Sequence, residues 1–140
     1  MKKSTTQLLD LLKSTKNLDK YFEENAEEFT ELKPYELLNE IIKKKNINKT
    51  ELIKKTCIER HYAYQILSGT KTPSRDKLLM FCFGLEMSID EIQHFLLKCS
   101  APQLYAKNKR DNVILFALEN KLTITEMNGM LFELGLDIFE

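Results

Sequence analysis

A chain of 140 residues is long enough for one domain of ordinary size with an appendage, but not for two full domains. Apolar residues make up 43% of it and charged residues 30%, which is a globular composition and excludes a chain that is disordered throughout. Four Gly and three Pro are too few turn-forming residues for a many-stranded sandwich or barrel, so we expect an all-α fold. The longest apolar run, Leu78–Leu85, is far too short to cross a membrane, and we expect a soluble, cytoplasmic protein.

The first 33 residues predict a helical arm. Ser4 is suited to cap a leucine-rich helix, and Asn17 is suited to cap a second helix that carries Leu18, Tyr21, Phe22 and, further on, Phe29. The arm also contains an acidic run, which we interpret as a solvated helix face or, alternatively, as a strap over a basic surface. The run consists of Glu23, Glu24, Glu27, Glu28 and Glu31.

Helix limits in the middle of the chain can be read from capping residues. Pro34 is placed to begin a helix that ends at Asn46. Asn48 is placed to cap a second, short helix, with Glu51 completing a capping box. We expect this second helix to end near Thr56.

Three more helices follow in the same unit. Glu59 can cap a helix that runs to about Ser68 and is ended by Gly69, the residue type that most readily adopts the left-handed conformation. Ser74 opens the next helix, and Ser88 with Glu91 forms a capping box for the last. Residues 34–99 thus predict a five-helix domain.

The C-terminal part repeats the preceding helical hairpin at an offset of 35 residues. Arg75-Asp76 recurs as Arg110-Asp111, and Ser88-Ile89-Asp90-Glu91 recurs as Thr123-Ile124-Thr125-Glu126. We therefore predict that residues 100–140 form a second hairpin packed on the first. After Gly135, an apolar tail requires a partner surface, in the same chain or another; it consists of Leu136, Ile138 and Phe139.

Charge is spread unevenly, although 21 basic residues balance 21 acidic ones overall. Between Lys43 and Lys77, ten basic residues stand against three acidic ones, a net charge of +7. A surface patch of one sign is typical of a nucleic-acid binder, although ordinary solvated helix surfaces can also produce one.

Four short segments of the middle unit occur in a characteristic order. They are Ile47-Asn48-Lys49-Thr50-Glu51-Leu52, then Ile66 with Gly69, then Pro73-Ser74, and finally Leu85-Glu86-Met87-Ser88-Ile89-Asp90-Glu91-Ile92. In these segments Leu37–Ile92 resembles the DNA-binding domain of phage repressors, the Cro-like or XRE helix-turn-helix family. The resemblance implies a sequence-specific transcriptional regulator that binds double-stranded DNA as a homodimer, without a cofactor. Its recognition helix, at about 59–68, would lie in the major groove.

The same resemblance assigns roles to individual residues. Base edges would be contacted by Arg60, His61 and Gln65. Phosphates would be contacted by Lys49, Thr70, Lys71, Thr72 and Arg75. Tyr62 and Tyr64 would either reach the DNA backbone or pack against the protein.

Some positions depart from the family pattern. Cys57 and Ile53 replace a usual Gly and Ala, which predicts a wider approach of the two helices. Glu59 replaces a usual Ser or Thr and brings an acid close to the expected phosphates. Ile42 and Leu67 stand where many members bury an ion pair, and two apolar residues are a self-consistent replacement.

Other function classes find less support. We expect no enzyme and no metal site, because the sequence offers no nucleophile with its base, no Gly-rich phosphate loop and no four-ligand set. Three cysteines without CxxC spacing predict free thiols that act as small buried side chains: Cys57, Cys82 and Cys99. The alternative function is a protein-interaction adaptor on a repressor-like scaffold, with the arm or the tail as its contact surface. Another alternative is control by phosphorylation at Ser68, Thr70, Thr72 or Ser74.

Overall fold

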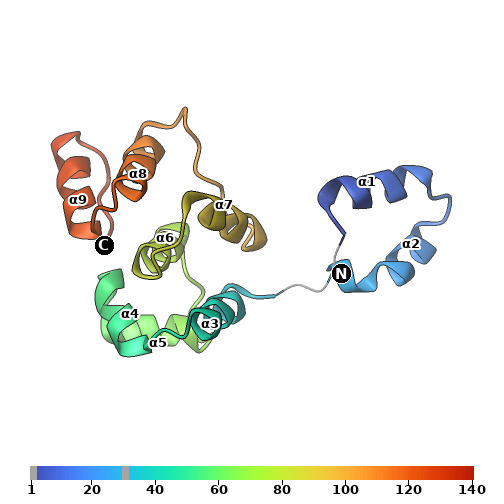
Figure 1. Cartoon of the computed structure of the whole chain (residues 1–140), viewed down its shortest axis with the longest axis horizontal. Helices are drawn as coiled ribbons and strands as arrows, with labels where there is room; N and C mark the ends of the chain where they lie inside the picture. Colours follow the sequence, from blue (N-terminus) through green and yellow to red (C-terminus); the bar gives the residue numbers. More distant parts are fainter. Residues whose placement is uncertain (1–2, 30–31) are drawn as a thin grey trace. The chain divides into compact units, whose positions relative to one another are not determined.

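The computed structural model describes residues 3–29 and 32–140, and every regular element in these two stretches is helical. The all-α expectation is confirmed. The chain separates into two compact units, Met1–Leu32 and Lys33–Glu140. Figure 1 labels the helices of both units.

The N-terminal unit is a helical hairpin followed by a single turn of 3-10 helix. Its elements are α1 (Thr5–Ser14), α2 (Leu18–Glu24) and η1 (Ala26–Phe29). The side chains of Ser4 and Asn17 cap α1 and α2, as predicted. The Tyr21 hydroxyl donates a hydrogen bond to the backbone oxygen of Leu8, 3.3 Å away, and so ties the two helices together. The side chain of Phe29 and the whole of Glu31 lie outside the described residues.

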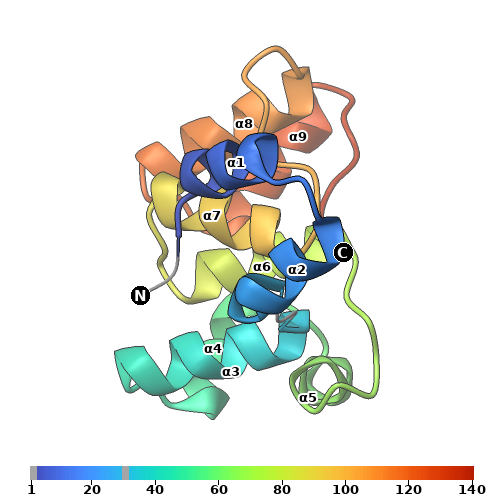
Figure 2. The same cartoon turned by 90° about the vertical axis from the view of Figure 1, so that its right-hand side faces the viewer.

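The second unit contains the remaining described helices, with the longest connection between α7 and α8. They are α3 (Pro34–Lys45), α4 (Lys49–Thr56), α5 (Arg60–Leu67), α6 (Arg75–Gly84), α7 (Ile89–Lys98), α8 (Lys109–Glu119) and α9 (Ile124–Glu133). In Figure 1, α6 lies between the α4–α5 pair and the α8–α9 pair. Figure 2, which views α5 nearly along its axis, shows that α5 lies at an edge of this unit.

Most predicted caps form as expected. Asn46 ends α3 in the left-handed conformation, and Ser74 and Ser88 cap α6 and α7. The capping box at Asn48 is an exception: Asn48 accepts the Glu51 N–H, but the Glu51 side chain does not return a bond. That half of the prediction was wrong. A single side-chain acceptor is enough to satisfy the helix start when the remaining N–H groups face water.

The core of this unit is centred on α6. Leu79, Phe81 and Cys82 of α6 are completely buried. Helix α4 packs directly on α6 at Gly84, where an added Cβ would lie 2.9 Å from a methyl carbon of Leu52. The absence of a side chain at this position therefore allows the close approach of the two helices.

The two C-terminal hairpins are joined by a reciprocal pair of salt bridges. The Arg75 guanidinium donates to both carboxylate oxygens of Asp111, at 3.0 and 2.9 Å. The Arg110 guanidinium donates to both carboxylate oxygens of Asp76, at 2.9 Å each. Each repeat thus supplies the arginine of one pair and the aspartate of the other, which is the arrangement of a local two-fold axis. The predicted repeat, with its second copy packed on the first, is confirmed.

The repeat extends to side-chain amides that hold the segment after each hairpin. Gln93 exchanges two hydrogen bonds with the backbone of Leu104. Asn128, its equivalent 35 residues later, exchanges two with the backbone of Phe139. Phe139 is 3% exposed, and the Arg110 guanidinium lies 4.4 Å from its ring centroid. The apolar tail therefore finds a partner for Phe139 within its own chain.

The cysteines differ from one another. Cys82 is buried and Cys99 is half-buried, and burial raises the pKa of the Cys99 thiol to about 11. Cys57 is exposed, so the expectation of a buried side chain was wrong for this residue. It ends α4 with its side chain directed away from the core. Within the described stretches, no helix has both the length and the apolar character to cross a lipid bilayer.

Candidate nucleic-acid interface

Helix α4 presents its N-terminus to solvent and its apolar face to the core. The Asn48 side chain accepts the Glu51 N–H at 3.1 Å and fixes the first turn. Leu52 and Ile53 are buried, whereas Lys49 is exposed beside the open N–H groups of the helix start. A helix N-terminus with a cation next to it favours an anion such as phosphate.

The turn between α4 and α5 is stabilised by a buried threonine. The Thr56 hydroxyl donates to the Ile53 carbonyl at 2.7 Å and accepts the Ile58 N–H at 3.2 Å. Cys57 adopts φ +59°, a conformation that favours glycine. The Cys57 side chain is exposed, so the larger residue at this position is accommodated with local backbone strain. The wider approach of the two helices stays a prediction.

Glu59 caps α5. Its carboxylate accepts the backbone N–H groups of His61 and Tyr62, at 3.0 and 2.9 Å. These two hydrogen bonds, that of His61 first, hold the pKa of Glu59 below its usual range. Glu59 therefore caps α5 as the usual Ser or Thr would.

Helix α5 has one buried and one open face. Ala63, Ile66 and Leu67 are buried, and the Leu67 carbonyl accepts a hydrogen bond from the Asn39 side chain of α3 at 2.8 Å. The opposite face is exposed and consists of Arg60, His61, Tyr64 and Gln65. All three residues predicted to contact bases thus lie on the solvent side of one short helix.

The two tyrosines of α5 behave differently. Tyr62 is half-buried, with the Lys77 ammonium 5.4 Å from its ring centroid. Tyr64 is 37% exposed, and the Arg60 guanidinium lies 6.0 Å from its ring centroid. Tyr62 is mainly a packing residue here, whereas Tyr64 flanks Arg60 on the open face.

The loop after α5 is fastened to the end of that helix. The Gln65 carbonyl accepts the N–H groups of Thr70 and Lys71, at 2.9 and 3.1 Å. Gly69 makes this fold-back possible: its φ is +83°, and an added Cβ would lie 2.8 Å from the Tyr35 ring. Three residues predicted to contact phosphate are exposed in this loop: Thr70, Lys71 and Thr72.

Arg75, also predicted to contact phosphate, has a different set of partners. Besides Asp111, its guanidinium donates to the carbonyls of Pro102 and Gln103, at 2.8 and 3.1 Å. Four of its five N–H donors are therefore used inside the protein. The structure assigns Arg75 to the joint between the hairpins, and we do not retain it as a phosphate contact.

Comparison with known proteins identifies the family of the segment that contains α4 and α5. Residues 37–95 match the family model of the Cro/C1-type HTH DNA-binding domain. These residues are a Cro/C1-type helix-turn-helix domain. The comparisons with curated proteins and with solved structures found no match. The resemblance expected from the short segments is thereby confirmed, and α3 to α7 of the structure correspond to the matched residues.

The Cro/C1-type domain has a groove of about 660 Å³ on the face that carries Arg60. Thr50 and Lys54 of α4 line it together with Arg60 and Tyr64 of α5. The sequence did not single out Thr50 or Lys54 as contact residues. Their spacing of four residues, one helical turn, places them on the same side of α4.

Several cations near this face of the Cro/C1-type domain have no acidic partner. Lys49, Arg60 and Lys71 form no ion pair within the part of the chain that the structure describes. Lys55, by contrast, lies 3.7 Å from the carboxylate of Glu86. The cations of the domain that form no ion pair among the described residues thus include those around α4, α5 and the loop that follows α5.

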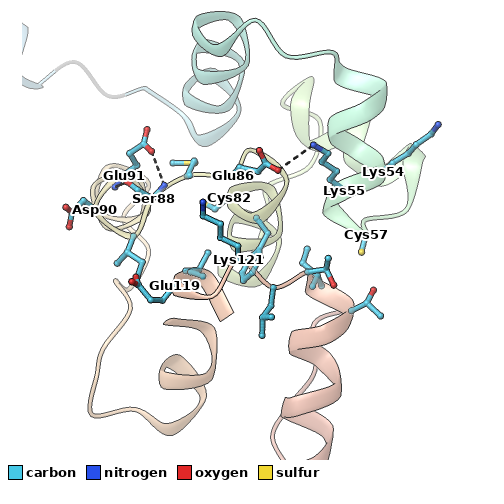
Figure 3. A pocket seen from close by; sticks show the side chains of 18 residues that line it. Lys54, Lys55, Cys57, Cys82, Glu86, Ser88, Asp90, Glu91, Glu119 and Lys121 are labelled. Carbon is cyan, nitrogen blue, oxygen red and sulfur yellow. Dashed lines mark hydrogen bonds and ion pairs between the residues drawn. The ribbon is translucent and has the colours of Figure 1, made fainter. Parts of the chain in front are cut away.

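A larger cleft, of about 1260 Å³, lies where the C-terminal ends of α4, α6 and α8 meet. Figure 3 shows Lys121 directed into this space and the Lys55–Glu86 ion pair at its edge. Its lining carries both signs of charge, with Asp90 and Glu119 among the acids. Among residues 3–29 and 32–140, no three His, Cys, Asp or Glu side chains are grouped so that they could hold a metal ion.

Proposed function

We propose that this chain is a sequence-specific DNA-binding transcriptional regulator that inserts α5 into the major groove. The supporting observation is the open face of α5, which presents Arg60, His61 and Gln65 beside cations that form no ion pair with any described residue. A short helix of this kind, held at the edge of its domain by buried residues on the opposite face, is the geometry that helix-turn-helix proteins use.

Base recognition is proposed for Arg60, His61 and Gln65. Arginine can donate two hydrogen bonds to O6 and N7 of guanine, and glutamine can pair with N6 and N7 of adenine. The side chains of Arg60 and Gln65 are exposed and separated by more than one turn of α5, so they would address different base pairs. His61 begins the helix and would lie near the DNA backbone or a base edge.

Phosphate contacts are proposed for Lys49, Thr70, Lys71 and Thr72. Lys49 lies at the N-terminus of α4, where the helix dipole adds to its charge. The loop residues lie beyond the other end of α5, so the two sets would hold the DNA backbone on both sides of the recognition helix. We add Lys54, which lines the groove beside Arg60, to this set.

The proposed regulator binds as a homodimer, because regulators of this type read two half-sites that are about 34 Å apart. It acts without a cofactor and without catalysis.

Selection from random DNA duplexes tests the proposal. Purified protein should enrich a motif, as an inverted repeat, and its affinity should fall steeply with rising salt concentration. The matched control is a chain with Lys49→Ala, Arg60→Ala and Gln65→Ala, which should enrich no motif although its thermal unfolding is unchanged. Failure of the unmodified protein to enrich any sequence at low salt would contradict the proposal.

A second candidate function is an adaptor that binds protein through the same scaffold. It is favoured by Phe132, which is 77% exposed, and by the mixed charge of the large cleft. An adaptor should bind DNA of every sequence equally weakly. The same selection experiment therefore separates the two candidates.

A further inference from the structure

We propose that the N-terminal hairpin is a self-association module: two copies of α1 and α2, from two chains, pack as an antiparallel four-helix bundle. The proposal identifies the segment that makes the homodimer of the proposed function. It rests on that function only for the placement of the two DNA-binding domains. The association itself is measured without DNA, so the failure of one proposal does not imply the failure of the other.

The leucines of α1 form an apolar stripe that the hairpin covers only in part. Leu8, Leu9, Leu11 and Leu12 span an arc of about 160° around the helix, wider than one neighbouring helix covers. No residue of α1 is buried, and Leu9, Leu11 and Leu12 are 47%, 40% and 41% exposed. Leu18 at the start of α2 is 51% exposed.

A helix as short as α1 needs packing against another surface in order to be stable. Helix α1 has ten residues, which is short for a helix that is stable on its own in water. Tyr21 of α2 is buried, and its hydroxyl donates to the backbone oxygen of Leu8; just outside the two helices, the Lys3 ammonium donates to the Asn25 amide oxygen at 2.6 Å. Burial of the exposed leucines against another surface would enlarge this small core.

Charge complementarity identifies a second copy as the occupant. At the turn between α1 and α2 and in the first part of α2, Lys13, Lys16 and Lys20 outnumber one acid, Asp19. Lys20 also lies 3.8 Å from the Glu24 carboxylate of its own helix. At the opposite, open end, four glutamates outnumber two lysines, Lys2 and Lys3; they are Glu23, Glu24, Glu27 and Glu28. A two-fold axis through the leucine face would place the basic turn of each copy beside the acidic open end of the other.

The C-terminal repeat is a less suitable dimer contact. Its self-complementary surface is already occupied, because Arg75 pairs with Asp111 and Arg110 pairs with Asp76 inside one chain. In the leucine stripe of α1, by contrast, Leu9, Leu11 and Leu12 are exposed.

The first experiment measures the mass of the full chain in solution by sedimentation equilibrium across a dilution series. The unmodified chain should show a mass of twice 16.4 kDa. The double variant Leu9→Glu, Leu12→Glu should raise the dissociation constant of the dimer by about a hundredfold or more. The matched control is Leu97→Glu, which places the same charge on an exposed leucine of α7 and should leave the dimer intact. A monomeric unmodified chain, or a double variant that remains dimeric, would overturn the proposal.

A charge-reversal series tests the antiparallel pairing directly. Reversing only the turn lysines, Lys13→Glu, Lys16→Glu and Lys20→Glu, should prevent self-association. Reversing only Glu23→Lys, Glu24→Lys and Glu27→Lys should do the same, while a mixture of the two variants should form a heterodimer. Failure of the mixture to associate would refute the antiparallel arrangement, even where a single variant has lost the helicity of its arm. Self-association of either single variant would refute it as well.

Discussion

Arg75 of the first hairpin and Asp111 of the second form a bidentate ion pair, with 22% and 7% of their side chains exposed. The symmetry-related pair of Arg110 with Asp76 has the same geometry, but the Asp76 side chain is 36% exposed. Removal of a buried carboxylate leaves an arginine without its counter-charge, whereas water can replace an exposed one.

We therefore expect Asp111→Ala to lower the free energy of unfolding by about 3 kcal/mol or more, and Asp76→Ala to lower it by about 1 kcal/mol. Urea unfolding followed by circular dichroism measures both values. Equal losses in the two variants would show that burial does not govern the strength of these pairs.

Gly84 and Gly129 provide a matched pair of helix glycines. A Cβ at Gly84 would lie 2.9 Å from side-chain carbons of Leu52 and Thr56, whereas a Cβ at Gly129 would meet nothing within 4 Å. Gly84→Ala should destabilise the protein by about 1–3 kcal/mol because it forces α4 away from α6. Gly129→Ala should stabilise it by about 1 kcal/mol through helix propensity alone. Thermal unfolding of the two variants measures this difference, and a stabilised Gly84→Ala protein would contradict the packing described.

Cys57 offers a test of strain in the turn before α5. Because its φ is +59°, Cys57→Gly should stabilise the fold by about 1 kcal/mol, although glycine increases the entropy of the unfolded chain. Cys57→Val should instead destabilise it, since a β-branched residue tolerates this conformation least. Urea midpoints of the two variants, compared with the unmodified protein, provide the measurement. A more stable valine variant would rule out a left-handed residue at this position.

Three capping glutamates should make stability depend on acid pH. Backbone N–H groups hold the pKa of each carboxylate below 4.5: those of His61 and Tyr62 for Glu59, that of Ser88 for Glu91, and that of Thr123 for Glu126. The stabilisation is present above the unfolded-state pKa and is lost as the pH falls through the lowered, folded-state pKa. Glu91→Gln and Glu126→Gln should each flatten the decline in unfolding free energy below pH 4.5. Glu133→Gln, whose carboxylate caps no helix, is the control and should leave the decline unchanged.

Two variants distinguish base reading from phosphate binding. Arg60→Ala should remove about 1–3 kcal/mol of discrimination at one position of the selected motif. Lys49→Ala should weaken binding to all sequences alike and reduce the salt dependence by about one counterion. Fluorescence anisotropy with matched and mismatched duplexes measures both effects, with Lys98→Ala on exposed α7 as the control. Identical, sequence-independent losses in both variants would contradict the assigned roles.

The local elements of this fold could be read from the sequence because their causes are local. A side-chain oxygen at Ser4, Ser74 or Ser88 bonds an N–H only three residues away, so the residue type and its position suffice. The same holds for Gly69, whose conformation is set by the turn it closes.

What could not be read were contacts between segments distant in sequence. The repetition of Arg75-Asp76 as Arg110-Asp111 was visible, but not that each arginine pairs with the aspartate of the other copy. Arg75 was predicted to contact phosphate because it belongs to the basic stretch. A count of charges along the chain does not reveal that its guanidinium is bonded within the protein. Phe116 shows the same limit: it is 52% exposed although its equivalent, Phe81, is fully buried, because α4 packs on the helix of only one copy.

The residues proposed to meet DNA were predicted from a family pattern rather than from periodicity. Arg60, His61 and Gln65 are exposed in the structure, because the opposite face of α5 packs into the core through Ala63 and Ile66. Lys54 escaped notice because its approach to Arg60 depends on the angle between α4 and α5.

The backbone oxygen of Gln65 anchors the loop that follows, while its side chain points outward. Any amino acid has that oxygen. If Gln65 reads a base as proposed, replacing it would change the preferred base pair and leave the backbone hydrogen bonds that hold the following loop in place. Base preference and loop anchoring would then be separable at this one position.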